Sequence, residues 1–186
     1  AALGQKDFTS PRIRVVEKTT VSRMDLMSLD MVYVPFREDC SMGEALSEAD
    51  SELQPGRWIL ISHGDWTGTM KEQNTVEKGV YMPLTRGDIE SGRPLRVILG
   101  HIHKPIDSGT VQYPGALCPL HINDCGRRRY LILDTETGET EAVPFDSPLL
   151  YFQADLIVLP VDDEASYIRE NIAAIRRKWG LDSDEK

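Results

Sequence analysis

The 186-residue sequence lacks several features that mark particular classes of protein. No apolar run approaches the ~20 residues that span a bilayer, and no charged-then-apolar leader opens the sequence. The cysteines are odd in number and lack the close paired spacing of a zinc knuckle; they are Cys40, Cys118 and Cys125. We therefore expect reduced thiols, a cytoplasmic location and no membrane contact.

Basic residues are too few to offset the acidic ones, and the formal net charge is -9. Nonspecific nucleic-acid binding rests largely on basic side chains, so this charge argues against a protein that coats a polyanion. It does not exclude an enzyme that acts on phosphate esters, because bound metal ions can supply positive charge. The clearest basic cluster, Arg127-Arg128-Arg129, is interpreted as a solvated hairpin turn after Gly126.

The hydrophobic pattern predicts an α/β core without internal repeats. Ser41 and Glu44 have the spacing of a capping box, which predicts a helix over residues 42–53. A second helix is expected over 162–179 from its single apolar face, and residues 85–94 form a loop or a brief helix. Strands are expected at 13–16, 29–36, 58–62, 79–84, 96–99, 110–113, 129–134, 141–145 and 155–159. Short strands joined by tight turns in the second half indicate two sheets.

Three of the four histidines follow the ends of two expected core strands. His63 comes directly after residues 58–62, and His101 and His103 follow 96–99 across Gly100. The carboxyl ends of core strands are a common place for ligand sites, and imidazole suits manganese, zinc, iron or nickel. A simple turn cap with a solvated histidine, or a mononuclear zinc site, would fit the same residues. His121 is expected to be structural or solvated, and Asp65 to be an exposed loop acid.

Three motifs together carry a resemblance to a known superfamily. They are Ser62-His63-Gly64, then Gly-His-Ile-His-Lys-Pro at residues 100–105, then Tyr113-Pro114-Gly115. The chain resembles the second half of a calcineurin-like metallophosphoesterase, and it is most similar to the SbcD-type DNA repair exonucleases. The resemblance implies that His63 and His101 bind one metal ion and that His103 binds the other. It also implies that Tyr113, Pro114 and Gly115 form the wall of the substrate pocket, with Ala116 where the family usually has serine.

The same resemblance sets the expected fold and partners. It implies half of a two-sheet metallophosphoesterase sandwich flanked by helices, with a C-terminal strand and helix. Residues 1–152 would form the C-terminal part of the catalytic core, and 153–186 the start of a capping domain. The implied activity is two-metal hydrolysis of DNA phosphodiesters, with Mn²⁺ as the expected ion. DNA and an SMC-like ATPase are the implied partners, and a homodimer is compatible with the family.

The family's first three motifs have no counterpart in this sequence. These are the Asp-x-His motif, the Gly-Asp that supplies a bridging carboxylate, and the Asn-His that supplies a ligand and the general acid; Asp88 and Asp124 do not match them. We therefore expect this chain to be the C-terminal portion of a longer enzyme, with no catalytic residue of its own and the general-acid histidine upstream. Three neutral imidazoles leave two dications poorly neutralised, so the chain alone should be inactive and bind at most one transition metal ion weakly. Alternatives are another calcineurin-like phosphatase, a cyclic-nucleotide phosphodiesterase, or a non-catalytic scaffold of the same fold.

Overall fold

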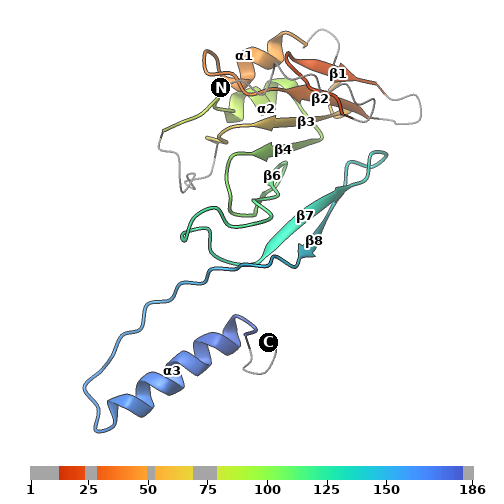
Figure 1. The fold of residues 1–186 in the computed structure, drawn as a ribbon. Coiled ribbons are helices and arrows are strands. Elements are labelled where there is room, and N and C mark those ends of the chain that lie inside the picture. The colour runs from red at the N-terminus through yellow and green to blue at the C-terminus, as the bar shows by residue number, and fades with distance from the viewer. Residues whose placement is uncertain (1–12, 24–28, 50–52, 69–78, 182–186) are drawn as a thin grey trace.

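The computed structural model describes residues 13–23, 29–49, 53–68 and 79–181. A six-stranded mixed sheet forms its centre, and a separate two-stranded sheet lies beside it (Figure 1). In spatial order the large sheet contains β1 (Thr20–Ser22), β2 (Asp30–Val34), β3 (Trp58–His63), β4 (Arg96–Gly100), β6 (Val111–Tyr113) and β5 (Ile106–Ser108). The small sheet is a hairpin of β7 (Arg128–Leu133) and β8 (Thr140–Phe145). The expectation of an α/β chain with two sheets is therefore confirmed.

The four central strands of the large sheet run parallel to one another. β2 pairs with β3, β3 with β4, and β4 with β6, all in parallel, whereas β1 and β5 are antiparallel at the two edges. Continuous apolar sequences such as residues 58–61 suit strands that are covered on both faces. The carboxyl ends of the four parallel strands therefore meet along one edge of the sheet.

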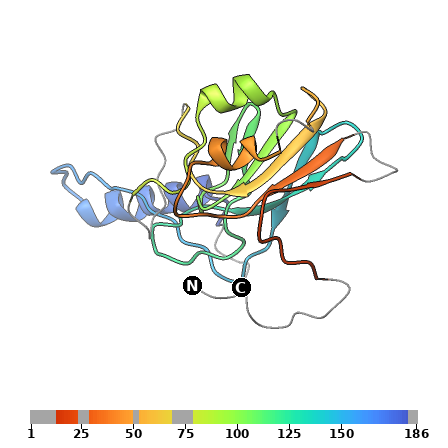
Figure 2. The same ribbon diagram turned by 90° about the horizontal axis from the view of Figure 1, so that it is seen from above.

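Two short helices connect these parallel strands, and each begins with a capping box. α1 (Met42–Ser47) is capped by Ser41 and Glu44 as expected, but it ends well before residue 53. α2 (Arg86–Gly92) is the brief helix expected in 85–94 and is capped by Thr85 and Asp88. Both helices lie on the same side of the sheet, as Figure 2 shows. They leave the opposite side to the β7–β8 hairpin, whose Leu133 packs against that face of the sheet.

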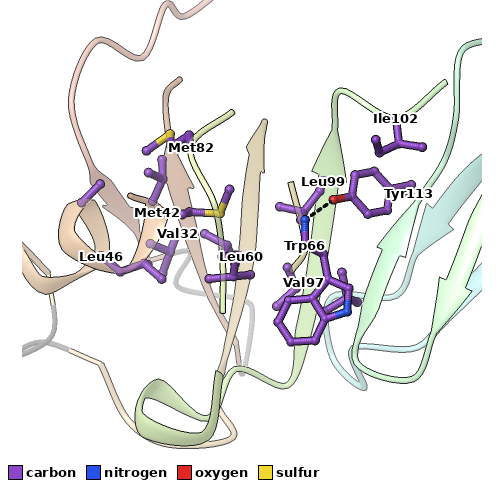
Figure 3. Packing of buried hydrophobic residues seen from close by; sticks show 14 of the residues in the cluster. Val32, Met42, Leu46, Leu60, Trp66, Met82, Val97, Leu99, Ile102 and Tyr113 are labelled. Atoms are coloured by element: carbon purple, nitrogen blue, oxygen red, sulfur yellow. Dashed lines mark hydrogen bonds between the residues drawn. The ribbon is translucent and has the colours of Figure 1, made fainter. Parts of the chain in front are cut away.

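The larger of two hydrophobic clusters fills the space under these helices. Met42 and Leu46 of α1 pack onto Val32 and Leu60 of the sheet, and Trp66 and Tyr113 extend the cluster past Leu99 (Figure 3). The smaller cluster lies on the other face and centres on Leu29, Met31 and Ile59. Side chains alternate along a strand, so His63 projects on the same side as Ile59 and Ile61 of this second face.

Three expected strands are absent as strands, and two strands, β1 and β5, were not predicted. Residues 13–16 and 155–159 are irregular, and the expected strand at 79–84 is reduced to an isolated bridge between Leu84 and Trp66. The apolar side chains in two of these segments do not find a strand partner; Ile157, for example, is 75% exposed. β5 carries Asp107 between its two ends and has only three residues, so its sequence has no alternation long enough to recognise.

The C-terminal helix α3 (Glu164–Lys178) confirms the expected helix over 162–179. An extended segment leads to it from the hairpin (Figure 1). The helix contains no fully buried residue and is tied back at its end, where Trp179 stacks on Phe152 with ring centroids 5.0 Å apart. None of the helices among the described residues has the length and apolar character required to cross a membrane. The expected division at residue 152 stays a prediction.

Candidate metal site at the carboxyl edge of the sheet

His63 and His101 lie side by side at the carboxyl edge of the parallel strands. His63 is the last residue of β3, and it pairs in register with Gly100, the last residue of β4. The centroids of the two imidazole rings are 5.4 Å apart, in an edge-to-face arrangement. The sheet therefore brings together two of the three histidines that were expected to be metal ligands from the family resemblance.

The His63 ring occupies the space where a side chain at residue 100 would lie. A Cβ on Gly100 would lie 2.5 Å from Nδ1 of His63, which is closer than atoms can approach. The next residue, His101, has a φ of +93°, outside the usual range for a non-glycine residue. Such a conformation costs about 1–3 kcal/mol and is found mainly where a site imposes it. The His101 side chain is also only 2% exposed.

Two further aromatic rings complete a cycle around the histidine pair. Tyr81 lies 4.9 Å from His101, and Phe36 lies 6.2 Å from His63, all measured between ring centroids. Phe36 and Tyr81 are themselves 6.2 Å apart. We refer to Phe36, His63, His101 and Tyr81 as the four-ring cluster. Sequence reasoning missed the two outer members, although Phe36 follows the end of β2 and so reaches the same edge of the sheet.

Asp65 is part of this environment, so the expectation of an exposed loop acid is wrong. Its side chain is 14% exposed, and its Oδ1 lies 3.7 Å from Nε2 of His101. Its Oδ2 accepts a hydrogen bond of 2.8 Å from the backbone N–H of Tyr81. The carboxylate therefore ties the loop after β3 to the loop that carries Tyr81, next to the buried imidazole.

His103 has a separate set of partners. Its Nδ1 lies 3.1 Å from Oδ2 of Asp124, a carboxylate whose side chain is fully buried. Its backbone oxygen accepts hydrogen bonds from the N–H of Ala116 (3.0 Å) and from Nη1 of Arg128 (3.1 Å). Asp124 was set aside at the sequence level because it follows no family motif. Its contact with His103 depends on tertiary structure that no local pattern reveals.

A cavity of about 230 Å³ connects His101 and His103 with the turn after β6. Pro114 and Gly115 line it together with Ile61 and Ile98 of the second sheet face. Tyr113 is not among the lining residues: its side chain is fully buried, and its hydroxyl donates to the Gly64 oxygen (2.9 Å) and accepts from the Trp66 N–H (2.7 Å). Burial raises the pKa of the Tyr113 phenol well above its ordinary value. Tyr113 thus fixes the His63–Gly64 turn from behind.

The arginine cluster does not form a solvated turn. Arg128 is 1% exposed and bonds to the His103 oxygen, as described above. Arg129 pairs with both carboxylate oxygens of Asp107, at 2.7 and 3.0 Å, which lowers the pKa of that acid. Only Arg127 is exposed, and its Nη2 donates to the Trp179 oxygen (3.1 Å). The expectation of a solvated turn is wrong because each guanidinium ties a different segment to the hairpin.

The donor types at this edge fit a first-row transition ion in part. Two imidazoles in contact and a third beside a buried carboxylate are donors that such ions accept. Within residues 13–23, 29–49, 53–68 and 79–181, no group of three or more His, Cys, Asp or Glu side chains is arranged to hold an ion. His121 lies apart and is exposed, with its Nδ1 accepting from the Asn123 N–H at 3.2 Å. All three cysteines are free thiols.

Comparison with known proteins adds no identification to this geometry. No protein-family model matches the chain, and no curated protein matches it significantly.

Proposed function

We propose that this chain is part of a binuclear metal-dependent phosphoesterase whose substrate is DNA, cleaved as an exonuclease or endonuclease. The observation that carries the proposal is the contact between His63 and His101 at the carboxyl edge of the sheet. A scaffold protein gains nothing from a strained, buried imidazole there, whereas a metal ligand must be held in place. The sequence motifs around the same residues point to the same chemistry.

In this proposal His63 and His101 hold one ion and His103 holds the other. The ions, expected to be Mn²⁺ from the resemblance, would supply positive charge to the phosphate and an activated water at neutral pH. The chain's own residues position these ligands: Gly100 leaves room for the His63 ring, and Asp65 lies beside His101. The remaining carboxylate ligands and the general acid come from the part of the enzyme that the family places upstream, so the chain alone is inactive.

The surroundings of the histidine pair support DNA as the substrate. Phe36 is 39% exposed and belongs to the four-ring cluster, so an aromatic face lies next to the proposed metal ligands. Aromatic rings stack on nucleobases of any sequence, and each such contact contributes about 1–3 kcal/mol. A small phosphomonoester without a nucleobase has no ring that could stack on Phe36. An SMC-like ATPase subunit and a second copy of the enzyme are the further partners of the proposal.

A Co²⁺ titration of the 186-residue chain tests the ligand assignment. We expect one weak site that is lost in His63→Ala and His101→Ala but retained in His121→Ala, which removes a histidine outside the site. Equal binding by all three variants would contradict the assignment. Mn²⁺-dependent cleavage of a phosphodiester by this chain alone would contradict its dependence on upstream ligands.

Assays of the full-length gene product test the substrate. We expect Mn²⁺-dependent hydrolysis of DNA ends in preference to small phosphomonoesters, and weaker activity on DNA in Phe36→Leu, which keeps the apolar volume but removes the ring. Hydrolysis restricted to phosphomonoesters or cyclic nucleotides would favour a phosphatase or a cyclic-nucleotide phosphodiesterase. A full-length protein with neither metal binding nor hydrolysis would be a scaffold of the same fold.

A further inference from the structure

An irregular segment joins β6 to β7 (Figure 1), and it contains a buried carboxylate. This carboxylate, Asp124, has no exposed side-chain surface. Its Oδ2 accepts hydrogen bonds from the backbone N–H groups of Leu120 (2.9 Å) and His121 (3.0 Å). Burying a charged group is costly unless it is paired and hydrogen-bonded. The hydrogen bonds around Asp124 must therefore offset the cost of burying its charge.

The third contact of the same oxygen is Nδ1 of His103, at 3.1 Å. An oxygen that already accepts two N–H groups has no room for a proton of its own. The hydrogen bond to His103 therefore requires the proton to reside on Nδ1 of the imidazole. A neutral imidazole carries one proton, so Nε2 of His103 is then left with a free lone pair.

The main chain of His103 is fixed from the same segment. Its carbonyl oxygen is held by Ala116 and Arg128, and a Cβ on Gly115 would lie 2.9 Å from it. Gly115 also has a φ of +85°, which favours glycine. Both the backbone and the ring of His103 are thus set by residues 115–128, with 16% of its side chain left exposed.

We infer that Asp124 is a positioning residue for His103: it selects the Nδ1–H tautomer and presents Nε2 as the metal-binding nitrogen. The role as a metal ligand rests on the proposed function, whereas the tautomer rests on the geometry alone. Carboxylates that bond the second nitrogen of a ligating histidine fix its orientation and raise its basicity. The simpler structural explanation is that Asp124 only caps the turn at residues 120–124. A cap would leave the tautomer of His103 unconstrained.

Another histidine of the same chain, His121, serves as an internal control because it is expected to be the opposite tautomer. Nδ1 of His121 accepts a hydrogen bond from the N–H of Asn123, so its proton must reside on Nε2. His103 and His121 are therefore expected to be opposite tautomers in the same molecule. Both can be assigned in spectra of the full chain by comparison with His103→Gln and His121→Gln.

The test is long-range ¹H–¹⁵N correlation of the imidazoles in the full 186-residue chain, at about pH 8, where an ordinary histidine is neutral. We expect the Nδ1–H pattern for His103 and the Nε2–H pattern for His121. An Nε2–H pattern for His103 in the wild-type chain overturns the inference, and this measurement requires no variant that must fold.

Two variants of Asp124 separate positioning from capping. Asp124→Asn keeps an oxygen that can accept from Nδ1 but removes the charge, so the Nδ1–H tautomer should persist. In the full-length enzyme the affinity for the ion assigned to His103 should fall about 10- to 100-fold. Asp124→Ala should shift His103 toward the Nε2–H form. An unchanged tautomer in a folded Asp124→Ala chain overturns the inference. Absence of Co²⁺ binding by a wild-type chain with Nδ1–H on His103 counts against the proposed function instead.

Discussion

Replacing Tyr113 with phenylalanine should destabilise the chain markedly although it removes a single oxygen. The ring keeps its volume, so no cavity forms in the cluster around Leu99 and Trp66. What is lost is a hydroxyl that donates to Gly64 and accepts from Trp66, both at buried positions. The substitution therefore isolates the value of two buried hydrogen bonds.

The expected magnitude follows from the groups left behind. A buried polar group that loses its partner costs about 1–3 kcal/mol, and two such groups are affected here. We expect the free energy of unfolding to fall by about 2–6 kcal/mol. That is a large share of the stability of an ordinary domain, which is about 5–15 kcal/mol.

Urea unfolding followed by circular dichroism measures this loss. The matched control is Tyr130→Phe, because the Tyr130 side chain lies on β7 and is 42% exposed. The control should change the free energy of unfolding by less than about 0.5 kcal/mol. Equal effects of the two substitutions would refute the reasoning, since it requires that burial of the hydroxyl, and not its mere presence, carries the energy.

Further predictions concern pH, two glycines and the C-terminal helix. Because the pKa of Tyr113 is raised on folding, its stabilising contribution is complete below about pH 10, and urea unfolding should show the advantage over Tyr113→Phe shrinking as pH rises further. Gly115→Ala should lower the free energy of unfolding by about 1–3 kcal/mol more than Gly109→Ala, because both have positive φ but only Gly115 meets neighbouring atoms. Gly100→Ala should weaken Co²⁺ binding while costing less than about 1 kcal/mol of stability, because the exposed His63 ring can swing away. Trp179→Ala should speed amide exchange in α3 and leave exchange in β3 unchanged; faster exchange in both would contradict separate stabilisation.

The parts of the fold that could be predicted are those with local signals. The apolar run of β3, the capping box at Ser41 and the amphipathic pattern of α3 each depend on neighbours in sequence, and each is confirmed. The strands that were predicted wrongly depend on pairing with distant segments, which the local sequence does not reveal. Residues 155–159 have the composition of a strand, but a strand also needs a partner edge, and the described chain does not offer one there.

The same division applies to the candidate site. Histidines at the ends of two core strands were recognisable from sequence, and the sheet does bring His63 and His101 into contact. Asp65 was expected to be an exposed loop acid, and Asp124 was set aside because it matches no family motif; nothing adjacent to either in sequence indicates burial. The arginines misled for a similar reason: three consecutive cations suggest solvent, yet two of them reach acceptors 16 to 25 residues away.

The register of β3 against β4 has a consequence for how this protein can vary. His63 and Gly100 are partners across a parallel ladder, so backbone hydrogen bonds set the spacing between the two neighbouring imidazoles. The connection between the two strands, residues 64–95, does not set it, even though it includes α2. Insertions and deletions in that connection can therefore reshape whatever approaches the edge of the sheet while the distance between His63 and His101 stays constant. The pairing of β3 with β4 must therefore be kept for the two histidines to stay in contact, whereas the connection between the strands can change in length and sequence.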